Sequence, residues 1–276
     1  MKKILFATDL DARSDRALDR AMMIATALNA KLHILHVVEN TWPRGAEKVA
    51  LTEIENLVGI SQKIHRISKE GQGVTPEIKV IRGKPAKEIV KEIKSIDPDL
   101  VIMGRGKDFT IEKIIIGTTV EKVIAKSDKP ILVVKARPKA AYETCLVAFD
   151  NSTGSRSALE TTLQIAPQAN LIIVNAAEYL RAQSDELGNI EDLIHGHSSK
   201  IIEETITPDQ KKPDLQILVD RGAATDVILT RVAEIKPDLV ACGRTGKTGL
   251  KSLLPGSTAQ VLLGHLPCDV LLAGVK

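Results

Sequence analysis

Aromatic residues are almost absent from the 276-residue chain. Phenylalanine, tyrosine and tryptophan together make up 2% of it, and Trp42 is the single tryptophan. Proteins that bind single-stranded nucleic acid stack its bases on such side chains, so the composition disfavours this class. The hydrophobic cores must be built from Ile, Leu, Val and Ala, which suits parallel sheets covered by helices on both faces.

The chain also has few cysteines, no long apolar run and no large excess of either charge. The three cysteines, Cys145, Cys242 and Cys268, are too few and too far apart for a disulfide framework or a zinc site. No apolar run approaches the ~20 residues that cross a bilayer, and the run after Met1 is too short for a signal peptide. The formal net charge is only +3, without a basic stripe. We therefore expect a cytoplasmic protein that binds neither membranes nor nucleic acid.

The sequence contains an internal repeat. Residues 2–18, KKILFATDLDARSDRAL, align with residues 143–159, ETCLVAFDNSTGSRSAL. Further matches follow in the same order: PDLV at 98–101 and 237–240, Gly104-Arg105 and Gly243-Arg244, and Gly117-Thr118 and Gly256-Ser257. Ordered matches along a whole half indicate a duplicated domain. We predict domains at residues 1–138 and 142–276, joined through the connector 135–143.

Each half alternates short apolar runs with segments of helical periodicity. In the first half we predict helices at 14–29, within 46–69, at 85–95 and at 118–127. The predicted strands are 4–8, 31–39, 77–83, 99–104 and 130–135, then 145–149, 171–176, 215–220, 238–243 and 269–274. This alternation predicts an α/β protein of two tandem Rossmann-like domains. Each would be a five-stranded parallel sheet in the order 3-2-1-4-5, flanked by helices.

A glycine-rich segment follows the fourth strand of the second half, at the edge where such sheets bind ligands. It reads GRTGKTG at 243–249, and Gly256-Ser257-Thr258 then opens a helix. Glycines let backbone N–H groups approach an anion, and a helix N-terminus with hydroxyl caps favours phosphate. Arg244 and Lys247 add positive charge. Asp150, after the first strand, could accept hydrogen bonds from a nucleoside or help to hold a hydrated Mg²⁺.

Two familiar phosphate-binding motifs do not match this segment. In a Walker motif ending at residues 246–248, the first glycine would fall at Ala241. The dinucleotide-binding fingerprint follows the first strand of its sheet, whereas this loop follows the fourth.

The pattern Gly243-x2-Gly246-x9-Gly256-Ser257 resembles the ATP-binding signature of the universal stress protein family. The resemblance extends to Ala148-Phe149-Asp150, Arg221-Gly222 and residues 267–270, and it covers both halves. It implies an adenine nucleotide alpha hydrolase-like fold that binds ATP, together with Mg²⁺, with Asp150 at the nucleoside end. The implied site comprises Ala148, Phe149, Asp150, Ala176, Cys242, Gly243, Arg244, Gly246, Lys247, Gly249, Gly256, Ser257 and Thr258. The adenine would pack near Ala148, Ala176 and Cys242. The family's strand-two His-Val appears here as Asn175-Ala176, which leaves a smaller wall against the base.

The corresponding loop of the first half departs from that signature. Lys107 and Thr110 replace the second and third glycines, and Asp108 would repel phosphate. We expect a structural domain with a degenerate nucleotide loop. The alternative is a changed ligand pocket, in which Gly106 substitutes one residue early and Lys107 reaches an anion. Trp42 is expected to anchor its loop or to cover the mouth of such a pocket, and His36 to serve packing.

The leading functional hypothesis is a stress-response regulator that binds ATP in its C-terminal domain and forms a homodimer of tandem chains. The alternative is a nucleotide-independent interaction scaffold. An ATP-consuming enzyme would need a second substrate site, and no Ser-His-Asp or Cys-His arrangement is evident, so we expect at most a slow ATPase. His195 and His197 lack a third neighbouring metal ligand.

Overall fold

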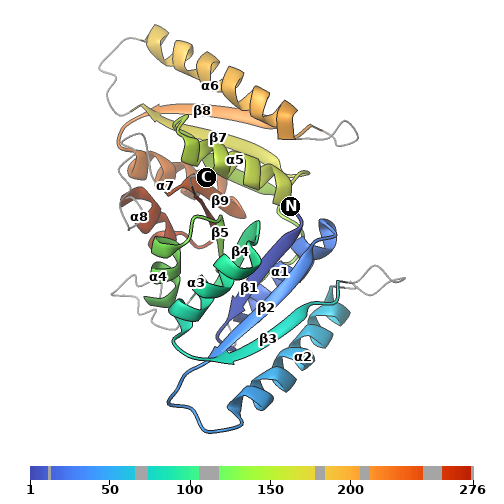
Figure 1. Cartoon of the computed structure of the whole chain (residues 1–276). Helices are drawn as coiled ribbons and strands as arrows, with labels where there is room; N and C mark the ends of the chain where they lie inside the picture. Colours follow the sequence, from blue (N-terminus) through green and yellow to red (C-terminus); the bar gives the residue numbers. More distant parts are fainter. Residues whose placement is uncertain are drawn as a thin grey trace. The chain divides into compact units, whose positions relative to one another are not determined.

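The computed structural model describes residues 1–11, 14–65, 74–105, 118–177, 184–205, 212–244 and 257–274. The chain divides into two compact units, Met1–Ala141 and Tyr142–Lys276 (Figure 1). Each unit is an α/β domain in which parallel strands alternate with helices.

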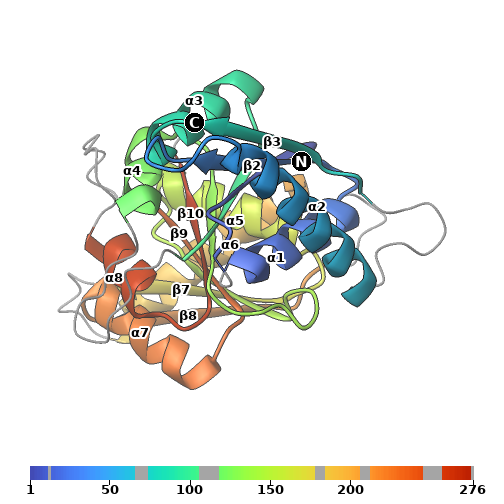
Figure 2. The same ribbon diagram turned by 90° about the horizontal axis from the view of Figure 1, so that it is seen from below.

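The first unit is a five-stranded parallel sheet (Figure 1, blue to green). Strand β2 lies between β1 and β3, β1 also pairs with β4, and β4 pairs with β5, so the order is 3-2-1-4-5. Helices α1 and α2 contact each other, as do α3 and α4, and Figure 2 shows the two pairs on opposite sides of β2 and β3. The elements are β1 (Lys3–Thr8), α1 (Ser14–Ala27), β2 (Lys31–Val38), α2 (Ala46–Ile64), β3 (Glu77–Arg82), α3 (Pro85–Ile96), β4 (Leu100–Gly104), α4 (Thr118–Lys126) and β5 (Ile131–Val134).

The second unit repeats this plan. Strand β7 lies between β6 and β8, β6 also pairs with β9, and β9 pairs with β10, which is again the order 3-2-1-4-5. The predicted fold class and strand order are therefore confirmed within each unit. The elements are β6 (Thr144–Ala148), α5 (Thr153–Ile165), β7 (Asn170–Ala177), α6 (Ser184–Thr205), β8 (Leu215–Arg221), α7 (Ala224–Ile235), β9 (Leu239–Gly243), α8 (Ser257–His265) and β10 (Asp269–Ala273).

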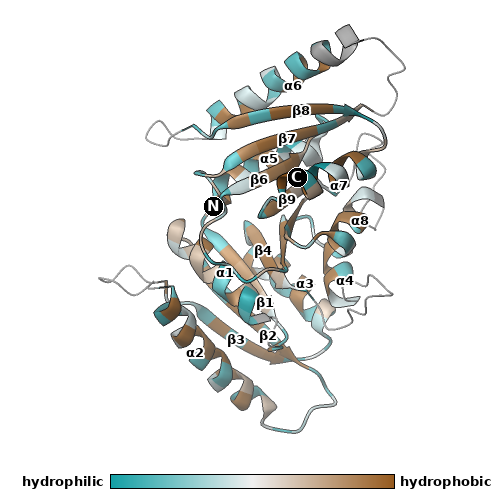
Figure 3. Ribbon diagram, turned by 180° about the vertical axis from the view of Figure 1, so that it is seen from behind, coloured by the Kyte–Doolittle hydropathy of each residue, from teal (hydrophilic) through white to brown (hydrophobic). Residues whose placement is uncertain are grey.

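The central strands form the cores because they are continuous aliphatic runs. Leu100, Val101 and Ile102 of β4 are fully buried, and so are Leu239, Val240 and Ala241 of β9. Strands covered on both faces lack the polar–apolar alternation of half-exposed sheets. Figure 3 shows this hydrophobic colouring along the strands, whereas α2 and α6 carry both hydrophobic and hydrophilic residues.

The repeated Pro-Asp-Leu-Val segments have an architectural role. Asp99 Oδ2 accepts hydrogen bonds from the backbone N–H groups of Lys2 and Lys3, at 2.6 and 2.9 Å. Asp238 Oδ2 accepts the equivalent bonds from Glu143 and Thr144, at 2.9 and 3.0 Å. In each unit, the carboxylate that precedes the fourth strand therefore fixes the start of the first strand.

Candidate functional site

In the second unit, the chain turns sharply after β6 and holds the Asp150 carboxylate in place. Phe149 is buried, and its N–H donates to the Val174 carbonyl at 2.9 Å. Asp150 Oδ1 accepts from the N–H of Ser152 at 3.0 Å, across Asn151, whose φ is 64°. Ser152 caps α5 by accepting from the N–H of Ser155 at 3.2 Å. The half-buried carboxylate therefore stands on a fixed turn at the carboxyl edge of the sheet.

Gly243, the last residue of β9, lies directly against the first turn of α5. A Cβ at this position would lie 2.7 Å from the carbonyl carbon of Gly154 and 2.9 Å from the backbone nitrogen of Ser155. Because both of these atoms belong to the backbone, no side-chain rotation could relieve the clash. Helix–strand packing alone is thus enough to require glycine at 243, whatever ligand the edge binds.

Cys242 lies at the same corner of the unit. Burial, followed by the negative charge of Asp150, raises the pKa of its thiol to about 12. Cys145 and Cys268 are also free and buried. A thiol that stays protonated at neutral pH is a poor nucleophile, so Cys242 acts as a small apolar group beside Asp150.

Asn175 makes a contact that the sequence interpretation missed. Its Nδ2 donates to the Phe149 carbonyl at 2.6 Å, and the residue is buried. In the first unit, His36 Nδ1 lies 2.9 Å from the Thr8 carbonyl, so it carries the hydrogen of the equivalent bond. Asparagine therefore keeps the link between the first two strands that histidine makes in the first unit. In the sequence, the alignment of Asn175 with His36 and of Phe149 with Thr8 was the signal that could have predicted this contact.

The remaining described residues of the predicted site lie along the same edge. Ala148 ends β6, Ala176 is the second-last residue of β7, and the Arg244 N–H donates to the Ala273 carbonyl at 3.0 Å. Thr225, in the first turn of α7, bonds to Thr258, in the first turn of α8, with 3.5 Å between their Oγ1 atoms. Ser257 begins α8. Gly246, Lys247, Gly249 and Gly256 lie outside the described residues, as do Gly106, Lys107, Asp108 and Thr110 of the first unit.

The first unit has a cavity of about 290 Å³ at the corresponding edge. It is lined by the carboxyl ends of β1, β2 and β4, by the loop after β2, and by the first turns of α3 and α4. Trp42 is one of the lining residues and remains 56% exposed. Trp42 was expected either to anchor its loop or to cover the mouth of a pocket, and its place on this cavity favours the second role.

Within the described ranges, no group of three or more His, Cys, Asp or Glu residues could hold a metal ion. His195 Nδ1 lies 3.4 Å from Ser199 Oγ, one turn along α6. None of the described helices combines the length and the apolar composition that crossing a membrane requires.

Comparison with known proteins supplies the family. Universal stress protein E of Salmonella typhi is 26% identical over 221 residues, which cover 72% of this chain and 68% of that protein. A solved universal stress protein from Archaeoglobus fulgidus DSM 4304 has a TM-score of 0.70 at 19% identity, over 99% of this chain and 98% of that one. Another from Archaeoglobus fulgidus, in complex with dAMP, covers 48% of this chain and 97% of its own, at 20% identity and a TM-score of 0.37. The sequence model of the universal stress protein family matches residues 1–135 and again 141–274. The chain therefore belongs to the universal stress protein family and contains two copies of its domain.

Proposed function

We propose that this protein is a stress-response regulator that binds ATP at the carboxyl edge of its second unit. Membership of the family supports a nucleotide ligand, since a family member has been solved in complex with dAMP. The signature glycines of the second half support placing the ligand there.

The observation that carries the proposal is the corner formed by Asp150, Cys242 and Gly243. Cys242 and Gly243 end β9 beside the Asp150 carboxylate, which the Ser152 N–H holds in place. A fixed carboxylate accepts hydrogen bonds from ribose hydroxyls or from water bound to Mg²⁺. These features fit the nucleoside end of ATP.

We infer the contacts with the ATP phosphates from the sequence motif. Residues 243–249 and 256–258 carry the glycines and helix N-terminus that suit phosphate. Bound ATP would stabilise the conformation that holds it, and we assign no group transfer to any residue.

Released nucleotide provides the first test. The purified protein is denatured, and the supernatant is analysed for nucleotide. We expect about one ATP per chain, because one of the two units would hold it. The absence of nucleotide, together with no calorimetric binding of Mg·ATP, would favour a nucleotide-independent scaffold instead.

Matched variants test which unit holds the ATP. Gly246→Asp should abolish Mg·ATP binding in calorimetry, because it adds bulk and negative charge to the phosphate loop. Lys107→Asp, the same change at the corresponding position of the first half, should leave binding intact. Asp150→Asn and Asp9→Asn form a second pair, of which only the first should weaken binding. The reverse pattern would assign the nucleotide to the first unit.

We also propose that two chains associate as a homodimer, since closed twofold assemblies are the commonest among soluble oligomers. Light scattering coupled to size exclusion should then give twice the chain mass of 29.9 kDa. A mass of one chain at micromolar concentration would contradict this.

A further inference from the structure

Four exposed lysines lie along one face of helix α3 in the first unit. They are Lys84, at the N-cap of the helix, and Lys87, Lys91 and Lys94 within it. At 3.6 residues per turn, these positions fall within about 80° of the helix circumference and extend over about 15 Å. The opposite face of α3 is buried, and the helix contacts β2. We call these four residues the lysine stripe.

The sequence interpretation missed this stripe. Its lysines are three or four residues apart and are separated by Pro, Ala, Glu, Ile and Val, so no basic run is visible along the chain. The turn of the helix brings them onto one face. Helix α4, which contacts α3 on the same side of β2 and β3 (Figure 2), adds the exposed Lys122 and Lys126. The expectation that the chain has no basic stripe is therefore wrong.

Few carboxylates balance the charge of the stripe. Among the described residues, its only ion pair joins Lys91 Nζ to Glu88 Oε2, at 3.9 Å. Glu92, the other carboxylate of α3, is buried and bonds to Lys79 at 2.7 Å. Soluble proteins usually intersperse charges of both signs on their surfaces. The exposed face of α3 instead presents positive charge along its whole length.

The stripe lowers the stability of its own helix. Lys84 and Lys87 stand at the N-terminus of α3, where the helix dipole disfavours a positive charge, and the Lys84 side chain makes no capping hydrogen bond. Lys87 and Lys91 are one turn apart, a spacing at which like charges repel each other. Side chains that are present at a cost to stability indicate a role other than folding.

The second unit shows that the fold does not need these lysines. Helix α7 has the same length as α3 and likewise follows the third strand of its sheet. The positions that align with the stripe are Ala223, Asp226, Thr230 and Ala233. The stripe is thus a property of the first copy and not of the duplicated fold.

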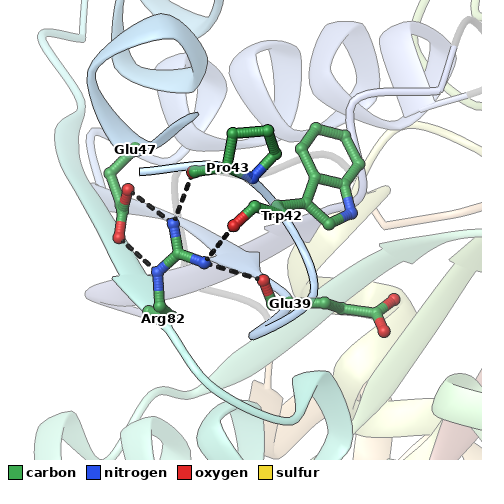
Figure 4. A network of polar contacts seen from close by, with 5 residues as sticks. All are labelled: Glu39, Trp42, Pro43, Glu47 and Arg82. Carbon is green, nitrogen blue, oxygen red and sulfur yellow. Dashed lines mark hydrogen bonds and ion pairs between the residues drawn. The ribbon is translucent and has the colours of Figure 1, made fainter. Parts of the chain in front are cut away.

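Arg82 holds the start of α3 in place without adding to the charge of the stripe (Figure 4). Its NH1 donates to the Trp42 carbonyl at 2.9 Å, and its Nε and NH2 bind the Glu47 carboxylate at 2.6 and 2.9 Å. Hydrogen bonds from Arg82 lower the pKa of Glu47 to about 2, so this carboxylate balances the guanidinium at neutral pH. The next N–H, that of Gly83, donates to the Val38 carbonyl at 3.0 Å. The first turn of α3 is therefore positioned before any partner binds.

The chemistry of the stripe favours carboxylates over nucleic acid or a membrane. It contains lysine and no arginine, whereas two-pronged recognition of phosphate favours arginine. Among the described residues, no exposed large hydrophobic side chain lies on α3 or α4, so this surface has nothing to insert into a bilayer or to stack on bases. Carboxylates on one face of a helix recur at the same intervals of three and four residues. The order three, four, three is the same in both directions, so a partner helix with these intervals matches the stripe in either orientation.

We propose that the lysine stripe binds an acidic helix of a partner protein, one whose carboxylates recur every three or four residues along one face. Complementary charges speed such an encounter and select the partner. The proposal rests on the first unit alone, so it stands or falls independently of ATP binding in the second unit.

A designed peptide tests the proposal on the full chain. It is an alanine-based helix, labelled with fluorescein, that carries four glutamates at the intervals of the stripe. A control peptide has the same composition, with its glutamates spread around the helix. At low salt, fluorescence anisotropy should show saturable binding of the first peptide. This binding should be about ten-fold tighter than that of the control, which can place only about half of its glutamates opposite lysines. Added salt should weaken it by screening the charges.

Matched variants locate the peptide on the stripe. Lys87→Gln combined with Lys91→Gln removes the two central charges. This double variant should weaken binding about 4- to 25-fold, since each exposed ion pair contributes about two- to five-fold. Lys48→Gln combined with Lys63→Gln removes the same charge from exposed positions of α2 and should change binding by less than about two-fold.

Thermal melts separate this role from a structural one. Lys87→Gln removes a positive charge from the N-terminus of α3, so it should raise the melting temperature by roughly 1–4 °C while it weakens peptide binding. A lysine that served folding would lower the melting temperature when replaced. Loss of binding in a more stable variant is therefore not the result of lost structure.

Four results would overturn the proposal. Absence of peptide binding at millimolar concentration and low salt would show that the stripe has no useful affinity for carboxylates. Equally tight binding of the two peptides would show that the spacing is irrelevant. Duplex DNA or phosphatidylserine vesicles that bind more tightly than the peptide, and no longer bind the double variant, would assign the stripe to nucleic acid or to a membrane. A lower mass of the double variant in light scattering would assign it to a contact between copies of the chain.

Discussion

Asp99 shows how one side chain can set the geometry of a unit. Its carboxylate accepts two backbone N–H groups at the start of β1. Burial raises the pKa of this carboxyl, but the hydrogen bonds from Lys2 and Lys3 outweigh that effect, so its pKa lies below the ordinary value. A carboxylate whose pKa is lower in the folded protein than in the unfolded chain stabilises the folded state at every pH at which it is ionised.

We expect Asp99→Ala to lower the free energy of unfolding by about 1–2 kcal/mol at pH 7, a value reduced by solvent screening at this exposed position. The contribution is present above the unfolded pKa of about 3.9 and is lost as the pH falls through the lower folded value. Urea unfolding at pH 7 and pH 3 should therefore show a smaller difference between wild type and variant at pH 3. Asp128→Ala, which alters another exposed carboxylate of the same unit, is the control. A pH-independent difference would mean that the carboxylate's charge is irrelevant.

The cysteines give a second prediction at this scale. The pKa of Cys242 is raised to about 12, and all three thiols are buried. At pH 8, we expect a disulfide reagent such as DTNB to react slowly with the folded protein. Once the protein is unfolded in guanidinium chloride, all three thiols should react. Rapid reaction of one thiol in the native protein would place that cysteine at the surface.

At the scale of helices and strands, β9 and α5 pack backbone against backbone at Gly243. Gly243→Ala would place a methyl group within 3 Å of the backbone of Gly154 and Ser155. We expect this overpacking to reduce the free energy of unfolding by about 1–3 kcal/mol.

Gly196→Ala is the matched control in the same unit. Gly196 lies within α6, and a Cβ there would meet nothing within 4 Å. Replacing a helical glycine by alanine should stabilise the unit by about 0.5–1 kcal/mol. Thermal melts of both variants measure the two effects. Equal stability of the Gly243 variant and wild type would show that β9 and α5 separate easily.

The helices and strands were predictable because their signals are local. Apolar runs such as residues 99–104 and 238–243 fall within one residue of β4 and β9. The helix predicted at 14–29 ends earlier, at Ala27, since the chain reverses at Asn29 with a φ of 47°. Repetition of these signals in the second half also predicted the duplicated domain. Apolar patterns and their periodicity depend only on residues that are close together in the sequence.

The sites depended on contacts between distant segments, which local patterns do not encode. Arg82 fixes the Trp42 loop through Glu47, 35 residues away in sequence. Asn175 replaces His36 only in the sense that both reach a carbonyl at the end of the neighbouring strand. Arg82 and Asn175 are common residue types, and nothing around them in sequence marks these roles. The sequence motif instead emphasised the glycines. For Gly243, packing against α5 is a sufficient reason for glycine at that position.

At the scale of the whole molecule, duplication lets the two copies diverge at their carboxyl edges, and we propose ATP for the second unit. Small changes account for such a divergence, because the strands and the carboxylates of Asp99 and Asp238 preserve both sheets while the loops at their carboxyl edges vary. Loops on a rigid scaffold are where function most readily changes.

Hydrogen exchange measured by mass spectrometry resolves the two units within the intact chain. Mg·ATP at about 100 times its dissociation constant should stabilise the unit that binds it by about 2.7 kcal/mol, which slows exchange roughly 100-fold at amides that exchange through opening of that unit. We expect this protection in β6, β9 and α5, with β1, β4 and α1 unchanged. The Gly246→Asp variant should lose this protection. Protection of β1 and β4 by ATP in wild type would contradict the assignment directly, since the nucleotide would then occupy the first unit.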